Sequence, residues 1–285
     1  MEIPFRLVDV FTTRPLAGNQ LCVIPDPGPL DPETMQAIAR EIGFSETTFV
    51  TRVDGDRYAM RIFTPGHELG FAGHPTIGTA FVLVSEGRVR SPAIQQVAAG
   101  EIPVEVDVRA RFGWMTQLPA TFGPDVEDRE RVARAIGLAV EDLDPELPIQ
   151  TVSTGLPHTI VPVRDLDALR RARPDTPLVA EAIGTAGGES CYLFALTGDG
   201  VTARMFDAEL GIGEDPATGS AAGPLGAYLS RHGVRGMPGR MILVRQGEQV
   251  GRPSELHVEA RSEGDTFRVR VGGGVHPVGR GVFEL

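Results

Sequence analysis

Two stretches of the sequence resemble each other: residues 68–80 read ELGFAGHPTIGTA, and residues 209–221 read ELGIGEDPATGSA. Aligned without gaps, six of the 13 positions are identical. Upstream, RIF (61–63) matches RMF (204–206) after a two-residue shift, and the same shift places Glu46 on Glu189. Three features in register over about 35 residues indicate that the chain contains a duplicated unit.

Each copy of the repeat reads as two strands, a glycine-rich loop and the start of a helix. Proline suits the first turn of a helix, so Pro75 and Pro216 predict that His74 and Asp215 are N-caps. The unpaired N–H groups and the positive end of such a helix favour an anion. Two facing domains would direct both helix starts at one cleft, which predicts His74 and Asp215 on opposite walls of a ligand site. The alternative for Asp215 is a purely structural helix cap.

The rest of the chain predicts a mixed α+β domain that occurs twice. Because long helices and strands do not alternate strictly, a doubly wound parallel sheet is disfavoured. Strands are expected at 4–11, 20–25, 46–52, 57–63, 103–109, 113–118, 158–163, 190–196, 201–206, 240–246, 255–260, 266–271 and 276–284. Helices are expected at 32–42, 75–85, 126–136, 165–172, 176–183 and 216–230. Glu68 and Glu209 are expected to be solvated loop carboxylates.

Composition and charge exclude several functions. The 285 residues carry a formal net charge of −11, which disfavours a nucleic-acid partner. All 27 basic residues are arginine, which excludes a lysine Schiff base and a P-loop. Cys22 and Cys191 are too far apart for a metal motif and HELGFAGH lacks H-E-x-x-H spacing, so no metal site is expected.

The sequence shows neither a secretory signal nor a membrane-spanning segment. The chain does not open with a basic region followed by an apolar stretch, and no apolar run is long enough to span a bilayer. These features predict a cytoplasmic protein without a membrane partner.

The segments GHPTIGTA (73–80), EDPATGS (214–220) and FSETTFV (44–50), with VDVFT (8–12) and TGLPHTIV (154–161), resemble the PhzF family of phenazine-biosynthesis isomerases. The resemblance extends over nearly the whole chain. It implies a diaminopimelate-epimerase-like fold: two pseudo-symmetric domains, each a curved mixed β-sheet wrapped around a central α-helix. It also implies a homodimer and a reaction without a cofactor or a metal.

The same resemblance implies that the last strand returns to the first domain. The domains are then expected at 1–118 plus 273–285 and at 119–272. In that arrangement we expect buried apolar contacts at Val282, Phe283 and Leu285.

The resemblance also implies the site residues. Glu46 is the expected general acid/base, and His74, Asp215 and Ser220 belong to the same site. Backbone groups near Gly73 and Gly219 bind the substrate, with Ser45 beside Glu46. The repeat alone leaves Glu46 and Glu189 as equivalent candidates, and only the resemblance selects Glu46.

The chemistry expected of these residues is a proton shift. Epimerases of this fold use two cysteines at positions that match Ala72 and Thr218 here, so racemisation by two thiols is disfavoured. A single carboxyl that is buried near Phe44 and Phe49 can move a proton between two carbons of a small carboxylate substrate. Two alternatives stay open: a dehydratase that acts on a hydroxy acid, and a non-catalytic carboxylate-binding protein.

Overall fold

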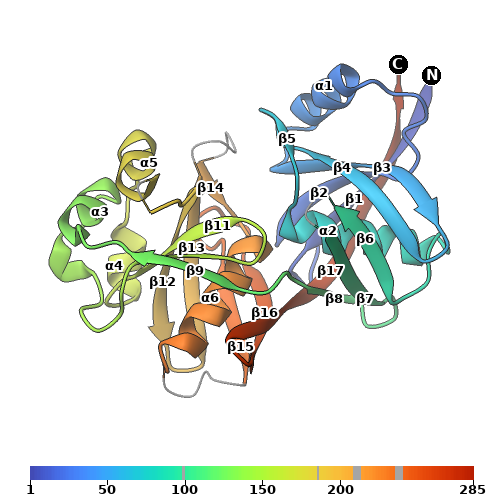
Figure 1. Ribbon diagram of the computed structural model, residues 1–285. Helices are drawn as coiled ribbons and strands as arrows, with labels where there is room; N and C mark the ends of the chain where they lie inside the picture. The colour runs from blue at the N-terminus through green and yellow to red at the C-terminus, as the bar shows by residue number, and fades with distance from the viewer. Residues whose placement is uncertain (98–99, 185, 208–212, 235–239) are drawn as a thin grey trace. The chain divides into compact units, whose positions relative to one another are not determined.

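The computed structural model describes residues 1–285 except 98–99, 185, 208–212 and 235–239. The described chain divides into two compact units (Figure 1). Unit 1 comprises residues 1–116 and 272–285, and unit 2 comprises residues 117–207 and 213–271. The long strand β17 (Thr266–Glu284) begins in unit 2 and ends in unit 1.

Both units are of the mixed α+β class, as predicted. Unit 1 contains, in addition to the end of β17, β1 (Glu2–Val10), β2 (Asn19–Ile24), α1 (Pro32–Ile42), β3 (Glu46–Asp54), β4 (Arg57–Phe63), β5 (Glu68–Leu69), α2 (Gly73–Ser85), β6 (Ala93–Val97), β7 (Gly100–Asp107) and β8 (Phe112–Thr116). Unit 2 contains β9 (Thr121–Asp125), α3 (Arg129–Ala135), a 3₁₀ turn (Val140–Asp142), β10 (Gln150–Ser153), β11 (Pro157–Pro162), α4 (Leu166–Arg171), α5 (Thr176–Gly184), β12 (Ser190–Thr197), β13 (Gly200–Asp207), β14 (Gly213–Asp215), α6 (Gly219–Arg231), β15 (Met241–Gln246) and β16 (Ser254–Glu263).

The two sheets repeat one pairing pattern. In unit 1, β2 pairs parallel with β3, β3 antiparallel with β4, β4 parallel with β6, and β6 antiparallel with β7. In unit 2, β11, β12, β13, β15 and β16 follow the same order of parallel and antiparallel pairs. In unit 1, β17 pairs with both β1 and β8, so the sheet closes around α2 (Figure 1). The duplicated unit inferred from the sequence is therefore confirmed.

Each sheet wraps around one buried helix. Residues 73–83 of α2 and 219–229 of α6 are all buried, as expected of helices that are enclosed on every side. Close packing needs glycine at two points. A Cβ on Gly78 would lie 2.6 Å from the side chain of Leu21, and one on Gly226 would lie 2.4 Å from that of Val258. These small residues let the helices approach the surrounding strands.

Helix α1 forms where local signals predict it. Asp31 caps its first turn by accepting a hydrogen bond from the Thr34 N–H at 2.8 Å, and Pro32 is the first helical residue. Gly43 ends the helix in the left-handed conformation, with φ of 68°. The buried face of α1 packs against a core cluster that includes Phe49 and Phe63.

The C-terminal strand pairs with β1, as predicted, from Val275 opposite Val10 to Glu284 opposite Glu2. The expected burial of its end is wrong in part, because Val282 is 50% exposed and Leu285 is 54% exposed. Side chains alternate between the two faces of a strand, and only Phe283 points inward. Its ring centroid lies 4.8 Å from that of Phe5. The two termini lie side by side (Figure 1), joined by backbone hydrogen bonds.

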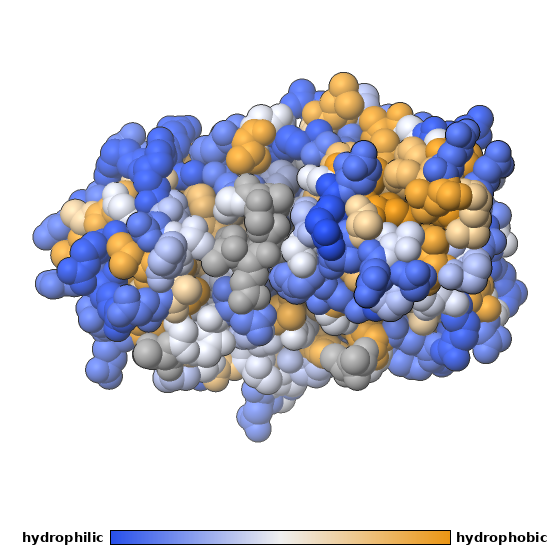
Figure 2. All heavy atoms as spheres, turned by 90° about the horizontal axis from the view of Figure 1, so that it is seen from above, coloured by the Kyte–Doolittle hydropathy of each residue, from blue (hydrophilic) through white to orange (hydrophobic). Residues whose placement is uncertain are grey.

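The surface differs between the units. On the face drawn in Figure 2, hydrophobic residues gather over unit 1, whereas the visible surface of unit 2 is more hydrophilic. The exposed large apolar side chains of unit 1 are Met1, Leu16, Val53, Val108, Val278, Val282 and Leu285. None of the helices in the described part of the chain has the length and apolar content that a membrane crossing requires.

Candidate active site

Glu46 and His74 meet inside unit 1. Glu46 is the first residue of β3 and is 7% exposed, and His74 is the second residue of α2 and is 3% exposed. The Nε2 atom of His74 lies 3.5 Å from Oε2 of Glu46 and 3.2 Å from the carbonyl oxygen of Gln20. Because a carbonyl oxygen can only accept, Nε2 must carry the hydrogen.

His74 is electrically neutral in this position. Burial lowers the pKa of its imidazole to about 3, and the hydrogen bond to Gln20 offsets only part of that effect. A neutral ring with a hydrogen on Nε2 leaves its lone pair on Nδ1. The 3.5 Å contact with Glu46 is therefore one between a carboxyl group and a neutral ring, and not an ion pair.

Ser45 and Gly73 lie next to this pair in the chain. The hydroxyl of Ser45 donates to Oδ1 of Asn19 at 2.9 Å, and both residues are buried. Gly73 is the first residue of α2, and the preceding residue, Ala72, has no side chain that can cap the helix. The first-turn N–H groups of a helix have no intrahelical acceptor, so this helix start is suited to hold an anionic group.

Asp215 lies within unit 2, at the end of β14, and is 4% exposed. Its Oδ2 accepts a hydrogen bond from the hydroxyl of Thr218 at 2.5 Å. Gln246, at the end of β15, donates to the carbonyl oxygen of Asp215 at 2.7 Å and accepts from the N–H of Thr218 at 3.2 Å. Sequence reasoning missed Gln246, because nothing near it in the sequence indicates that it holds a loop 31 residues away.

Gly219 and Ser220 are the first two residues of α6. The carbonyl oxygen of Gly219 accepts from the side-chain amide of Gln117 at 2.8 Å, and that amide accepts in turn from the hydroxyl of Thr154 at 2.7 Å. Ser220 is 7% exposed. The structure therefore brings Asp215, Gly219 and Ser220 together at one helix start.

The N-cap predictions are wrong for both helices. Ala72 is the N-cap of α2 and Thr218 that of α6. His74 is inside the first turn of α2, while Asp215 precedes α6 by four residues. Pro75 fits the third position of α2 because the N–H groups of the whole first turn lack an intrahelical acceptor. Ala72 and Thr218 are also the two positions matched above to epimerase cysteines.

The structure also corrects the register of the repeat. Arg61 holds Glu68 through two hydrogen bonds of 2.7 and 2.6 Å, and Arg204 holds Glu214 in the same way at 3.0 and 2.7 Å. In the strand pairing, Glu68 is opposite Phe63 and Glu214 is opposite Phe206. Glu68 is thus equivalent to Glu214. It is a strand residue paired with Arg61 and not a loop residue, but its side chain is 41% exposed, so the expected solvation holds. Glu209 lies outside the described residues.

This register changes which side chains are equivalent at the two helix starts. Helices α2 and α6 each have 13 residues, so His74 is equivalent to Ser220. Asp215 is equivalent to Leu69, because these residues pair with the corresponding positions of β13 and β4. The sequence alignment of His74 with Asp215 is therefore five residues out of register.

The alignment of Glu46 with Glu189 is also out of register, by one residue. Thr47 pairs with Phe63 in unit 1, and Cys191 pairs with Phe206 in unit 2. The residue one position earlier is Glu46 in the first case and Ser190 in the second. Glu189 is exposed to solvent, so the structure removes the equivalence that the repeat alone suggested.

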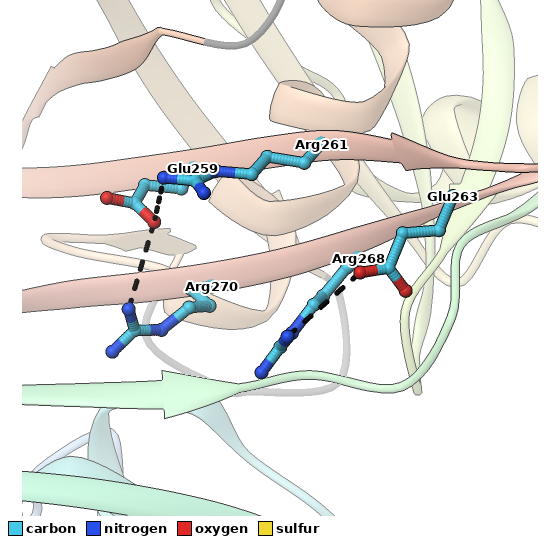
Figure 3. A pocket seen from close by; sticks show the side chains of 5 residues that line it. All are labelled: Glu259, Arg261, Glu263, Arg268 and Arg270. Carbon is cyan, nitrogen blue, oxygen red and sulfur yellow. Dashed lines mark ion pairs between the residues drawn. The ribbon is translucent and has the colours of Figure 1, made fainter.

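The side chains of the two cysteines pack into other clusters, that of Cys22 under α1 and that of Cys191 against α3, α4 and α5. Cys22 in β2 and Cys191 in β12 are buried, and burial raises the pKa of each thiol to about 12. A hollow of about 170 Å³ over β16 and β17 is lined by charged side chains (Figure 3): Glu259, Arg261, Glu263, Arg268 and Arg270. Its ion pairs have N–O distances of 3.8 to 4.0 Å, and solvent-exposed pairs of this kind contribute little to the stability of the fold. Among the described residues, no group of three His, Cys, Asp or Glu side chains could hold a metal ion.

Comparison with known proteins shows which family this chain belongs to. The sequence profile of phenazine biosynthesis-like proteins (PhzC–PhzF) matches residues 8–281. An uncharacterized isomerase of Deinococcus radiodurans is 38% identical over 93% of this chain and 90% of its own. A trans-2,3-dihydro-3-hydroxyanthranilate isomerase of Pseudomonas fluorescens is 34% identical over 99% of both chains.

Solved structures with the same fold support this family assignment. A PhzF-family phenazine biosynthesis protein of Bacillus anthracis superposes with a TM-score of 0.88 at 31% identity, with all of both chains covered. A probable proline racemase of Agrobacterium radiobacter, at 14% identity and a TM-score of 0.70 over 99% of this chain and 93% of its own, shares the fold. The chain thus belongs to the phenazine biosynthesis-like PhzC–PhzF family and is an isomerase with the epimerase-like fold of that family.

Proposed function

We propose that this chain is a cofactor-independent isomerase that moves a proton within a small carboxylate-bearing substrate, with Glu46 as the general acid/base. The closeness of Glu46 and His74 carries the proposal, because it places a buried carboxyl oxygen 3.5 Å from the ring of a buried, neutral histidine whose Nε2–H is held by Gln20. Relatives that are 34% and 35% identical are named trans-2,3-dihydro-3-hydroxyanthranilate isomerases. A cyclic dihydro-hydroxy amino acid of this kind is the substrate that we propose to test.

The proposed reaction needs one base and no other reactant. The Glu46 carboxylate removes a proton from one carbon, and the electron pair of that C–H bond moves into the adjacent π system. The same carboxyl then returns the proton to a second carbon, so one C–H bond breaks and another forms. The Nε2–H of His74 donates to the carbonyl oxygen of Gln20, and the same nitrogen lies 3.5 Å from Oε2 of Glu46, so a fixed N–H dipole lies beside the carboxylate between these steps.

The remaining groups of the predicted site are proposed to bind the substrate. Uncapped N–H groups at the starts of α2 and α6, near Gly73 and Gly219, suit a carboxylate. The hydroxyls of Ser45 and Ser220 can donate or accept hydrogen bonds, and the carboxyl of Asp215 can accept one from a substrate amine.

Glu46→Gln tests the proposal most directly. The amide keeps the size of the side chain but cannot carry the proton, so we expect turnover of trans-2,3-dihydro-3-hydroxyanthranilate to fall at least about 10²-fold. The melting temperature should stay near that of the wild type. Glu189→Gln is the matched control, because the sequence repeat pairs Glu189 with Glu46 while the structure leaves it exposed. Turnover by Glu46→Gln at the wild-type rate would refute the assignment.

Mass spectrometry of the product distinguishes the alternatives. An isomerase leaves the mass of the substrate unchanged, whereas a dehydratase removes one water. A carboxylate-binding protein would retain the substrate without any turnover, and Glu46→Gln would then change only its affinity. The proposed homodimer is checked by light scattering, in which a mass near twice 30.5 kDa is expected.

A further inference from the structure

A second buried hydrogen-bonded pair lies in unit 2. The Nδ1 atom of His158, in β11, is 2.5 Å from the hydroxyl oxygen of Ser190, the first residue of β12. His158 is 3% exposed and Ser190 is 1% exposed. Within the described part of the chain, Nε2 of His158 is buried and has no hydrogen-bond partner. A buried polar atom without a partner is costly, so this arrangement needs an explanation.

The pair faces α6. Alternate residues of β12, from Cys191 to Ala195, pack into the cluster formed with α3, α4 and α5. Ser190, Tyr192 and Phe194 therefore point to the opposite face. On that face, the ring of Phe194 contacts Tyr228 near the end of α6, and the hydroxyl of Tyr192 donates to Gln246, which holds the start of α6.

The direction of β12 then places the pair at the start of α6. Phe194 lies near the end of that helix and Tyr192 reaches the residue that binds its N-cap. Ser190, two residues earlier in the strand, continues in the same direction. Ser190 and His158 thus lie toward the end of the sheet at which Asp215, Gly219 and Ser220 gather.

The strand register gives an independent argument. Ser190 occupies the position in unit 2 that Glu46 occupies in unit 1. The parallel neighbour of Glu46 in the register is Leu21, and the parallel neighbour of Ser190 is His158. Unit 2 therefore carries a polar pair at the place where unit 1 carries its proposed acid/base. The exposed fractions of Glu46, His74, Asp215 and Ser220, at 3 to 7%, show that the candidate groups in both units are equally buried.

The ring of His158 is neutral. Burial lowers its pKa to about 4, so one ring nitrogen carries a hydrogen and the other a lone pair. A hydroxyl can donate to Nδ1, which leaves the hydrogen on Nε2. That N–H would then be a buried, oriented donor with nothing to bind until a ligand arrives.

We propose that His158 is a further substrate-binding residue, oriented by Ser190: the hydroxyl of Ser190 donates to Nδ1, and Nε2–H donates to a carboxylate oxygen of the substrate. This inference rests on the proposed function for the nature of the substrate. Ser190 acts through His158 and is a positioning residue.

The test uses the full chain labelled with ¹⁵N-histidine and titrated with 3-hydroxyanthranilate, an aromatic analogue that carries the carboxylate and has no sp³ ring carbon from which a proton could be shifted. Long-range ¹H–¹⁵N spectra report which ring nitrogen is protonated, and His158→Gln assigns the signals. We expect Nε2–H in the free protein and a shift of that resonance when the analogue binds. His158→Phe should weaken binding about 10- to 100-fold, as the loss of one charge-assisted hydrogen bond would.

Variants of Ser190 separate positioning from simple packing. Ser190→Ala should give a mixture of the two ring tautomers and a smaller loss of affinity than His158→Phe. Ser190→Thr keeps the hydroxyl and should restore the single tautomer. The wild-type spectra decide the matter if His158→Phe does not fold.

Several results would overturn the inference. These are a hydrogen on Nδ1, binding of the analogue without any change at His158, no binding of the analogue, or unchanged affinity in folded His158→Phe. The analogue is not turned over, so its binding is independent of the Glu46→Gln assay. An inactive Glu46→Gln with an unmoved His158 signal would remove only this inference, and the reverse result would remove only the proposed function.

Discussion

Units 1 and 2 share a scaffold but differ in the groups at their helix starts. The strand pairing, the length of the central helix and the Arg–Glu pair beside it are the same in both. The positions that carry Glu46 and His74 in unit 1 carry Ser190 and Ser220 in unit 2. Side chains that hold the strands together have been kept, and those that face the helix start have diverged. The features that the two units share therefore belong to the scaffold, and the side chains in which they differ at the helix starts are the candidates for binding and catalysis.

The Arg–Glu pairs offer the sharpest test of this comparison. Both arginines stack on the phenylalanine two residues later, with guanidinium-to-ring distances of 5.0 Å for Arg61 and 4.7 Å for Arg204. They differ in burial, because the Arg204 side chain is 5% exposed and that of Arg61 is 29% exposed. Arg204 also donates to the carbonyl oxygens of Leu169 and Ala172, at 2.8 and 3.0 Å.

Arg204→Met should therefore have the larger effect on stability. It leaves the carboxylate of Glu214 buried without its partner, which typically costs about 3–5 kcal/mol. Arg61→Met removes a solvent-screened pair and should cost about 0–1 kcal/mol. Urea unfolding of the two variants measures the difference, and equal costs would show that the two pairs do the same structural work.

The parts of the fold that could be predicted from sequence are those with local causes. Helix α1 begins and ends where Asp31, Pro32 and Gly43 indicate, because a cap, a proline and a left-handed glycine act over a few residues. The register of the repeat has no local cause. It depends on Arg204 reaching Glu214 and on the pairing of β13 with β14, across a connection that is three residues longer than in unit 1. Alignment by identity placed Glu209 there instead.

The site shows the same limit. The resemblance to a family selected Glu46 and His74, and the structure places them 3.5 Å apart. Gln246 was missed because it joins Asp215 and Thr218 only through contacts across strands, and the pair of His158 and Ser190 was missed because only the strand register places it opposite Glu46 of unit 1. Their residue types carry no signal in isolation, and only the three-dimensional register makes them stand out.

The C-terminal strand gives a second stability test, of intermediate size. Phe283 packs against Phe5 and against the cluster under α1, whereas the neighbouring Val282 points to solvent. Phe283→Ala should cost about 2 kcal/mol, below the 3–5 kcal/mol of a fully buried phenylalanine. Val282→Ala, its matched control, should change stability by less than about 0.5 kcal/mol. Thermal unfolding checks both, and a costly Val282→Ala would mean that this face of β17 is covered.

The last comparison is between the buried histidines, one in each unit. Burial lowers the pKa of His74 to about 3 and that of His158 to about 4, from an ordinary value near 6.5. Above pH 6.5 both rings are neutral whether the chain is folded or not, so they add no pH dependence. Below pH 6.5 the two histidines bind protons in the unfolded chain but not in the folded chain, so the free energy of unfolding falls as the pH falls.

Each histidine should contribute about 1.4 kcal/mol per pH unit to that fall, from pH 6.5 down to its native pKa. His158→Gln and His74→Gln remove one titrating ring each, so each should flatten the dependence of unfolding free energy on pH by that amount, and the double variant by about twice as much. Carboxylates that titrate below pH 5 affect all the variants alike and cancel in the comparison. Urea titrations between pH 5 and 6.5 measure the slopes. A His158→Gln slope equal to that of the wild type would mean that the folded protein accepts a proton on His158, and the neutral donor inferred for unit 2 would not exist.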